Sequence, residues 1–352
     1  MESGISMVEA GNSQLTYEKK HELNVGVDIG FLGDRINLLS DYYVRNNYDL
    51  IGDIFTTGVE GGNILTRANV ASMKSSGFEF TISSRTVATK DFRWNTDFVF
   101  SKQSNEITDL KNQPRVIDLI TGTGFNREGY PVRALFSIPF AGLNDEGLPT
   151  FYNEKGEVTI SNIYFQENQE LDFLKYEGPT DPTIVGSLGN NFSYKGFKLD
   201  VFITYSFGNV VRLDPVFAVA YSDLTAMPRE FKNRWVVPGD ENVTNIPVIA
   251  SLRQYQNVSS LAYSYNAYNY CDVRIAKGDF IRMKEIALSY HFPKKWLEPI
   301  RFNDASLKLQ VTNPFLIYAD KKLNGQDPEF FNTGGVAVPM PKQVTLSVRF
   351  SL

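Results

Sequence analysis

The chain has very little of the material from which catalytic and metal sites are built. Its 352 residues include one cysteine, Cys271, and two histidines, His21 and His291. A single cysteine excludes an internal disulfide framework and a zinc ribbon. Two histidines leave almost nothing for a histidine-based metal site or a catalytic triad. We therefore expect no enzymatic activity, no catalytic residues, no metal site and no cofactor.

Long apolar runs and an excess of basic residues are also missing. The longest apolar runs, such as 216–221, fall far short of the roughly 20 residues that a membrane-spanning helix needs, so a helical membrane protein is excluded. With 35 basic and 40 acidic residues the net charge is −5, which argues against nucleic acid as a partner. The first residues show no basic segment followed by an apolar one, so no secretory leader is visible.

What the chain does have is strict alternation at its end. The last nine residues switch between apolar and polar at every position, which is the period of a β-strand. With an aromatic residue close to the end of the chain, this pattern is typical of the closing strand of an outer-membrane β-barrel. We expect its apolar row to face lipid: Val344, Leu346, Val348, Phe350 and Leu352.

The same alternation recurs along the chain, and aromatic residues make up 13% of it. Charged residues occupy the polar row of many of these segments, which a dry soluble core would not tolerate. In one segment the alternation changes phase near Glu285, which predicts a β-bulge. The alternating segments are 24–31, 36–45, 78–83, 92–101, 197–205, 286–292 and 307–312.

The connections between these segments are alternately short and long. Short ones lie at 33–34, 86–91, 195–196 and 293–303, and long ones at 46–73, 104–182, 208–277 and 319–341. Tight turns on one side and long loops on the other are typical of outer-membrane barrels. The sequence thus predicts nine crossings in an all-β, antiparallel transmembrane β-barrel segment with long extracellular loops.

Nine strands do not close a usual barrel of even strand number. An open sheet edge in lipid would leave backbone groups unpaired at a cost of several kcal/mol each. We therefore expect residues 1–352 to be the C-terminal part of a larger β-barrel.

Six segments read as motifs in a fixed order. Segment 17–28 is YEKKHELNVGVD, and segment 278–290 is GDFIRMKEIALSY; shorter motifs lie at 35–43, 69–79, Asn313 and 327–329. Together they resemble the SusC/RagA family of TonB-dependent outer-membrane transporters of Bacteroidetes. Two departures are Tyr17, where the family has tryptophan, and Pro314 after the asparagine.

This resemblance implies a transporter of the cell outer membrane, without catalysis, that imports oligosaccharides captured with a SusD/RagB-like lipoprotein. It implies that the TonB–ExbB–ExbD system drives release and that the plug, the TonB box and the early strands lie outside residues 1–352. Import of peptides, or surface binding without transport, are the alternatives. A soluble all-β enzyme is disfavoured by the charged strand rows.

One long segment, 251–272, is crowded with rings and amides. Aromatic rings stack on sugar faces and amide side chains read hydroxyl groups, so this segment is our candidate for substrate binding. Strand extensions, interfacial ring belts or an interface with the lipoprotein would explain the same tyrosines. The candidate residues are Tyr255, Tyr263, Tyr265, Tyr268, Tyr270, Asn266 and Asn269.

Two acidic segments, 144–147 and 153–157, resemble calcium-holding loops. Neither keeps the full ligand spacing, and Lys155 adds a positive charge to the second. Ordinary Asn/Gly turns explain them better than a calcium site does.

Overall fold

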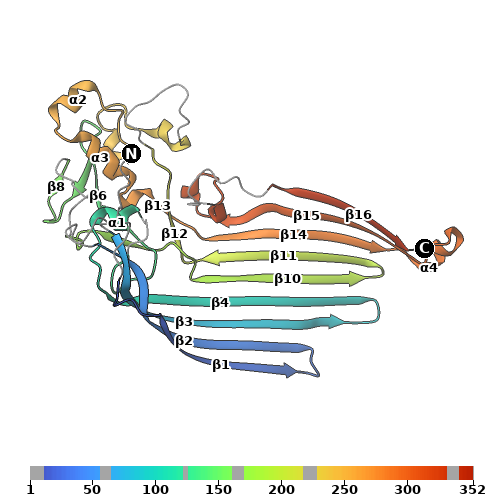
Figure 1. The fold of residues 1–352 in the computed structure, drawn as a ribbon. Helices are drawn as coiled ribbons and strands as arrows, with labels where there is room; N and C mark the ends of the chain where they lie inside the picture. Colours follow the sequence, from blue (N-terminus) through green and yellow to red (C-terminus); the bar gives the residue numbers. More distant parts are fainter. Residues whose placement is uncertain are drawn as a thin grey trace, which may run out of the picture.

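The computed structural model describes residues 12–55, 65–121, 126–160, 170–216, 228–330 and 341–351. Its main element is a nine-stranded antiparallel sheet whose strands are neighbours in chain order, with β1 and β16 at its edges (Figure 1). Within the described residues, this confirms the predicted number of strands in the sheet. The strands are β1 (Lys19–Phe31), β2 (Ile36–Phe55), β3 (Leu65–Ala88), β4 (Phe92–Leu110), β10 (Ile184–Tyr194), β11 (Phe197–Phe207), β14 (Phe280–His291), β15 (Asp304–Ala319) and β16 (Gln343–Ser351).

Short and long connections lie at opposite ends of this sheet. The tight turns, and the slightly longer link that contains α4 (Lys294–Leu297), are at one end, and the long segments gather at the other (Figure 1). One expected loop is shorter than predicted, because β2 and β3 continue to pair from Leu50–Ala71 to Phe55–Leu65 after two shifts of register. In this region the backbones of β2 and β3 still pair, although their side chains no longer alternate between apolar and polar.

The strand register keeps apolar and polar side chains on opposite faces across the sheet. Neighbours in register form an apolar row across six strands, and the adjacent position of each strand forms a polar row on the other face. The apolar row is Leu346, Leu309, Leu288, Leu199, Phe192 and Trp94; the polar row is Ser347, Lys308, Ser289, Lys198, Ser193 and Arg93.

Rings reinforce the apolar face. Phe80 lies 5.1 Å from Phe100 and 5.7 Å from Phe98, measured between ring centroids. Trp94 stacks on Phe192 at 5.6 Å, and Phe197 lies 4.5 Å from Tyr290. Such cross-strand aromatic pairs fix the register as well as the face.

Charged groups on the polar face have polar partners. Ser83 donates to Asp97 at 2.7 Å, and Ser101 donates to Glu79 at 3.2 Å. Glu285 accepts from Gln310 at 3.0 Å. A face of this kind fits a wet surface and does not fit a dry core.

The predicted bulge is confirmed at β14. Phe202 pairs with Glu285 and Ile203 pairs with Met283, so Lys284 has no partner on β11. The pairing of β14 with β15 shifts at the same place. An extra residue of this kind turns the later side chains to the other face.

The long segments form a second part of the structure, which we call the loop body. It comprises the described parts of 111–181, 208–279 and 320–330, and it contains small sheets of its own. The expected long loops are therefore partly strand and helix. Their elements are α1 (Val116–Thr121), β5 (Ala134–Ser137), β6 (Phe140–Leu143), β7 (Pro149–Tyr152), β8 (Val158–Thr159), β9 (Lys175–Pro179), β12 (Val210–Arg212), α2 (Leu252–Asn257), α3 (Leu261–Asn269) and β13 (Ile275–Lys277).

The hydrophobic core lies in the loop body and not on the sheet. Its largest cluster draws fully buried side chains from segments far apart in sequence, such as Val116, Phe136, Phe151 and Cys271. Among the described residues, no helix has the length and apolar character needed to cross a membrane.

Two motifs of the sequence meet in the sheet at Gly77. Gly77 pairs with Tyr43, and a Cβ atom at position 77 would lie only 2.4 Å from the Tyr43 ring. The guanidinium of Arg45 lies 4.2 Å from the centroid of the same ring. The missing side chain of the glycine thus leaves the space that the tyrosine ring fills.

We expect Gly77→Ala to destabilise the protein by about 1–3 kcal/mol, the usual cost of forcing extra atoms into a filled space. The matched control is Gly189→Ala on β10, where the nearest atom to an added Cβ is 3.7 Å away. Heat-induced loss of sheet signal in detergent, followed by circular dichroism, measures both. Equal shifts of the two variants would contradict the role of Gly77.

Candidate functional site

The ring-rich segment 251–272 forms two short helices of the loop body, α2 and α3, where we expected part of a long loop. Ser251 caps α2: its hydroxyl accepts from the Gln254 amide at 3.3 Å, and the Gln254 side chain accepts from the Ser251 amide at 2.9 Å. This capping box is visible in the sequence as serine followed three residues later by glutamine. It is the signal by which α2 could have been predicted.

Of the predicted substrate-binding tyrosines, two are part of the core. Tyr265 and Tyr268 are 0% and 1% exposed. The Tyr265 hydroxyl donates to the Val248 carbonyl at 2.5 Å, and the Tyr268 ring meets Phe140 edge-on at 5.7 Å. Both rings are enclosed by protein, and their contacts hold α3 in place.

The remaining candidates lie nearer the surface to different degrees. Tyr263 is 44% exposed, and Asn266 is exposed beside it on α3. Tyr255 is half-buried against the small cluster around Leu261. The Asn269 side chain is buried and accepts from the Val216 amide at 3.2 Å.

Tyr270 is half-buried, and the guanidinium of Arg212 lies 5.4 Å from the centroid of its ring. Arg212 also donates to the Phe136 carbonyl at 2.6 Å, so it ties β12 to β5. Burial lowers the pKa of Arg212 to about 10, which leaves it charged at neutral pH.

Cys271 is fully buried, and burial raises the pKa of its thiol to about 12. A thiol that is protonated at neutral pH and closed off from solvent is a poor nucleophile.

At β9, Lys175 lies between two carboxylates, those of Glu177 and Asp272. Lys175 lies 3.0 Å from Asp272 and 3.6 Å from Glu177. Burial of its carboxylate raises the pKa of Glu177 above the ordinary value, and this outweighs the attraction of Lys175. One carboxylate oxygen of Glu177 is buried without a hydrogen-bond partner.

The two acidic segments are turns. The Asn144 side chain accepts from the amides of Glu146 and Leu148 at 3.1 and 2.8 Å. The Asn153 side chain accepts from Lys155 and Glu157 at 3.0 and 2.8 Å. These side-chain oxygens are used to close turns. Within the described parts of the chain, no group of three or more potential ligands is placed to hold a metal ion.

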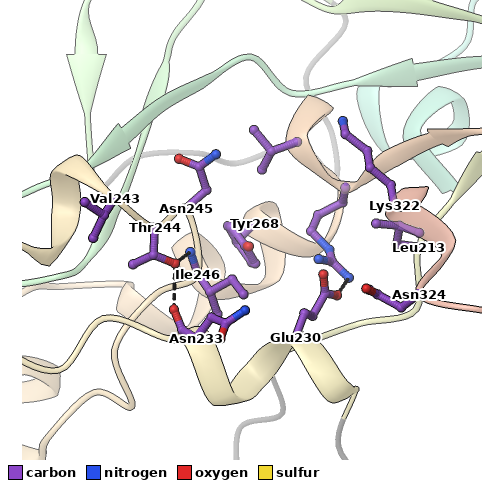
Figure 2. Close-up of a pocket in the computed structure, with 12 residues that line it drawn as sticks. Leu213, Glu230, Asn233, Val243, Thr244, Asn245, Ile246, Tyr268, Lys322 and Asn324 are labelled. Carbon is purple, nitrogen blue, oxygen red and sulfur yellow. Dashed lines mark hydrogen bonds and ion pairs between the residues drawn. The ribbon is translucent and has the colours of Figure 1, made fainter. Parts of the chain in front are cut away.

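A cavity of about 390 Å³ opens in the loop body, beside the core face of α3 (Figure 2). None of the substrate-binding candidates except Tyr268 lines it. It is bordered by residues from four separate stretches of chain: Leu213, Glu230, Asn233, Val243, Thr244, Asn245, Ile246, Tyr268, Val273, Arg274, Lys322 and Asn324.

The closing strand shows the expected side-chain pattern. Val344, Leu346, Val348 and Phe350 are between 61% and 68% exposed, and the register places Leu346 in the apolar row described above. Leu352, the fifth residue predicted to face lipid, lies outside the described residues.

No protein-family model matches the chain. In sequence it is 25% identical, over 96% of its length, to the TonB-dependent receptor P39 of Formosa agariphila. It is also 25% identical, over 99% of its length, to the TonB-dependent receptor SusC of Bacteroides thetaiotaomicron. The chain spans 35% and 33% of these two relatives, or about a third of their length.

Solved structures agree with these matches. The RagAB peptide transporter has a TM-score of 0.71 at 22% identity, over 92% of this chain and 34% of that one. The RagAB peptide importer in its open-open state has a TM-score of 0.76 at 22% identity, over 99% of this chain and 36% of that one. In sequence and in fold the chain is thus similar to TonB-dependent receptors of the SusC/RagA type. Proteins of this type are β-barrels of the outer membrane, which is where this chain is placed.

Two of the sequence motifs, far apart in the chain, are joined by ion pairs. Arg282, on β14, is buried and pairs with Asp327, and its Nε lies 3.0 Å from Glu329. Lys284 lies 3.7 Å from the other oxygen of Glu329. The segment 278–290 and the 327–329 motif are thus one structural unit, which fastens the end of the loop body to the sheet.

A third motif fastens the segment that leads into β1. The Asn69 side chain accepts from the Thr16 amide at 2.8 Å and donates to the Thr16 carbonyl at 2.9 Å. It also donates to the Asp49 carbonyl at 2.5 Å. The Asn69 side chain therefore joins the segment before β1 to β2 and β3.

We expect stability to depend on pH through Glu177. A raised pKa in the folded state stabilises the fold below the pKa of the unfolded carboxyl, and this stabilisation is lost as the pH rises through the folded value. The Glu177→Gln variant has no carboxylate to ionise, so it does not lose this stabilisation. The difference in melting temperature, variant minus parent, should therefore increase from pH 4 to pH 8. Exposed Glu128 supplies the control, since Glu128→Gln should show no such trend. An equal trend in both variants would contradict the attribution of the pH dependence to Glu177.

Proposed function

We propose that residues 1–352 supply the C-terminal wall and outer loops of a TonB-dependent importer of oligosaccharides. The observation that carries this proposal is the pair of unbroken rows across six neighbouring strands of the sheet. Each row needs its own environment: lipid on the apolar side and water on the polar side. On this reading Val344, Leu346, Val348, Phe350 and Leu352 face lipid, and β1 and β16 pair with further barrel strands.

The partners follow from the same reading. A SusD/RagB-like lipoprotein would cover the loop body, and the TonB–ExbB–ExbD system would act through a region outside residues 1–352. The relatives are named as receptors and transporters, which is consistent with a role without catalysis. Peptide import is the alternative, and the likeness to RagAB shows the fold alone at 22% identity.

Within the ring-rich segment, we assign ligand contact to Tyr263 and Asn266, with Tyr255 at the edge. Tyr263 presents a ring and Asn266 an amide on the exposed side of α3. A flat ring beside hydrogen-bonding groups is the usual recognition chemistry for sugars. The buried rings of Tyr265 and Tyr268 support the helix from below.

Uptake in the native bacterium tests the function. Cells that carry the gene should accumulate a fluorescent oligosaccharide mixture, and a deletion strain or cells treated with a protonophore should not. A labelled peptide mixture is the second arm. Accumulation of peptide alone would support the alternative, whereas surface labelling that does not need energy would show a binding protein and overturn import. The mass of the protein detected in outer membranes with an antibody to 251–272 shows whether it is longer than 352 residues.

We expect Tyr263→Ala to weaken oligosaccharide binding about 2- to 10-fold, the range of one lost aromatic contact. Tyr152→Ala is the matched control, because Tyr152 on β7 is 43% exposed, almost the same as Tyr263. Titration calorimetry of the detergent-purified native protein measures both affinities. Unchanged binding in the Tyr263 variant would remove α3 from the binding surface.

A further inference from the structure

The short connections at one end of the sheet differ in charge. Those at 32–35 and 89–91 each carry one acidic and one basic residue. The turn at 195–196 and the link 292–303 together carry a net charge of +3, in a chain whose net charge is −5. We call these two segments the basic end. Its charged residues are four cations and one anion: Lys195, Lys294, Lys295, Arg301 and Glu298.

The two segments of the basic end are neighbours in the structure. The His291 amide donates to the Gly196 carbonyl at 2.9 Å, so the turn lies against the start of the link. Within the link, Leu297 at the end of α4 is 4% exposed, and its carbonyl accepts from the Phe302 amide at 3.2 Å. Figure 1 shows α4 at the end of β14 and β15 that lies away from the loop body. The excess positive charge is therefore concentrated in one place.

The four cations of the basic end have no acidic partner. All four are exposed, and among the described residues no carboxylate forms an ion pair with any of them. The ammonium of Lys195 lies 5.2 Å from the centroid of the Tyr194 ring. On the adjoining strands, Asp304 and Arg349 are of opposite sign and leave the excess unchanged. A group of like charges of this kind attracts anions.

Aromatic rings border the apolar face of the sheet at the same end. Tyr290 meets Phe292 edge-on at 5.1 Å, and Phe292 lies 6.5 Å from Trp296 on α4, measured between centroids. Trp296 is 55% exposed. Rings at the end of an apolar barrel face are typical of the boundary between lipid and water. The register row nearest the turns is Phe92, Tyr194, Phe197, Tyr290, Leu307 and Val348.

We propose that the basic end binds the head group of an anionic phospholipid in the periplasmic leaflet. The tight turns of an outer-membrane barrel lie on the periplasmic side, so the bordering rings lie at the level of the head groups. From there the long side chains of Lys294 and Lys295 reach phosphate oxygens. A zwitterionic head group also carries an ammonium group, which the excess positive charge repels. The proposal rests on the proposed function, because it places the apolar face in lipid.

Native mass spectrometry of the native protein, purified in detergent from outer membranes, tests the site with two lipids. Phosphatidylglycerol has one net negative charge, whereas phosphatidylethanolamine with the same acyl chains carries an ammonium group beside the phosphate. We expect phosphatidylglycerol to bind about 10-fold more tightly. Added salt should remove this preference, because it screens exposed charges.

Two double variants with the same loss of charge locate the site. Lys294→Gln/Lys295→Gln should weaken binding of phosphatidylglycerol about 5- to 30-fold, with a smaller effect on phosphatidylethanolamine. Lys155→Gln/Lys232→Gln removes two exposed lysines of the loop body and should leave both affinities unchanged. Trp296→Ala should weaken both lipids alike, because the preference of its ring for the interface does not depend on the charge of the head group.

The results separate the head-group site from the transport function. Equal affinities for the two lipids, or equal effects of the two double variants, would overturn the site even if uptake is confirmed. Displacement of phosphatidylglycerol by a soluble muropeptide, which is anionic but has no acyl chain, would overturn the assignment to lipid. A preference that depends on Lys294 and Lys295, in a protein whose deletion does not affect uptake, would support the site and contradict import.

Discussion

Backbone pairing between neighbouring strands is the interaction on which the rest of this structure depends. Each strand alternates with a period of two, so a slip of one residue would mix apolar and polar side chains on both faces. The register prevents this over six strands, from Trp94 to Leu346. At Lys284, which has no partner on β11, the bulge of β14 interrupts the alternation of the two faces. A sheet of this kind has two outer environments in place of an internal core, as the outer-membrane type requires.

Because the sheet has no core of its own, packing is concentrated in the loop body. Its largest cluster brings together Val116, Phe136, Phe151 and Cys271 from long connections at the same end of the sheet. Arg212 crosses between two small sheets by donating to the Phe136 carbonyl. The outer segments are therefore a folded unit, able to hold binding groups in fixed positions.

Ion pairs attach this unit to the sheet: Arg282 on β14 pairs with Asp327 and Glu329 of the loop body. Within the sheet, Asn69 joins β3 to Asp49 on β2 and to Thr16 before β1. Buried ion pairs contribute little net stability but are strongly destabilising when one partner is lost. The pairs of Arg282 fix the 327–329 segment of the loop body against β14.

The sequence by itself determined the strand number, the two faces, the bulge near Glu285 and the resemblance to SusC/RagA transporters. These are local properties, because alternation and turn spacing are written along the chain. Tertiary structure decided which tyrosines of 251–272 are accessible: Tyr265 and Tyr268 look like Tyr263 in sequence, but core contacts with Val248 and Phe140 enclose them. It also decided the cavity beside Arg274, whose lining comes from four stretches of chain. A sequence period cannot predict which distant segments pack together, and that packing decides which side chains are buried.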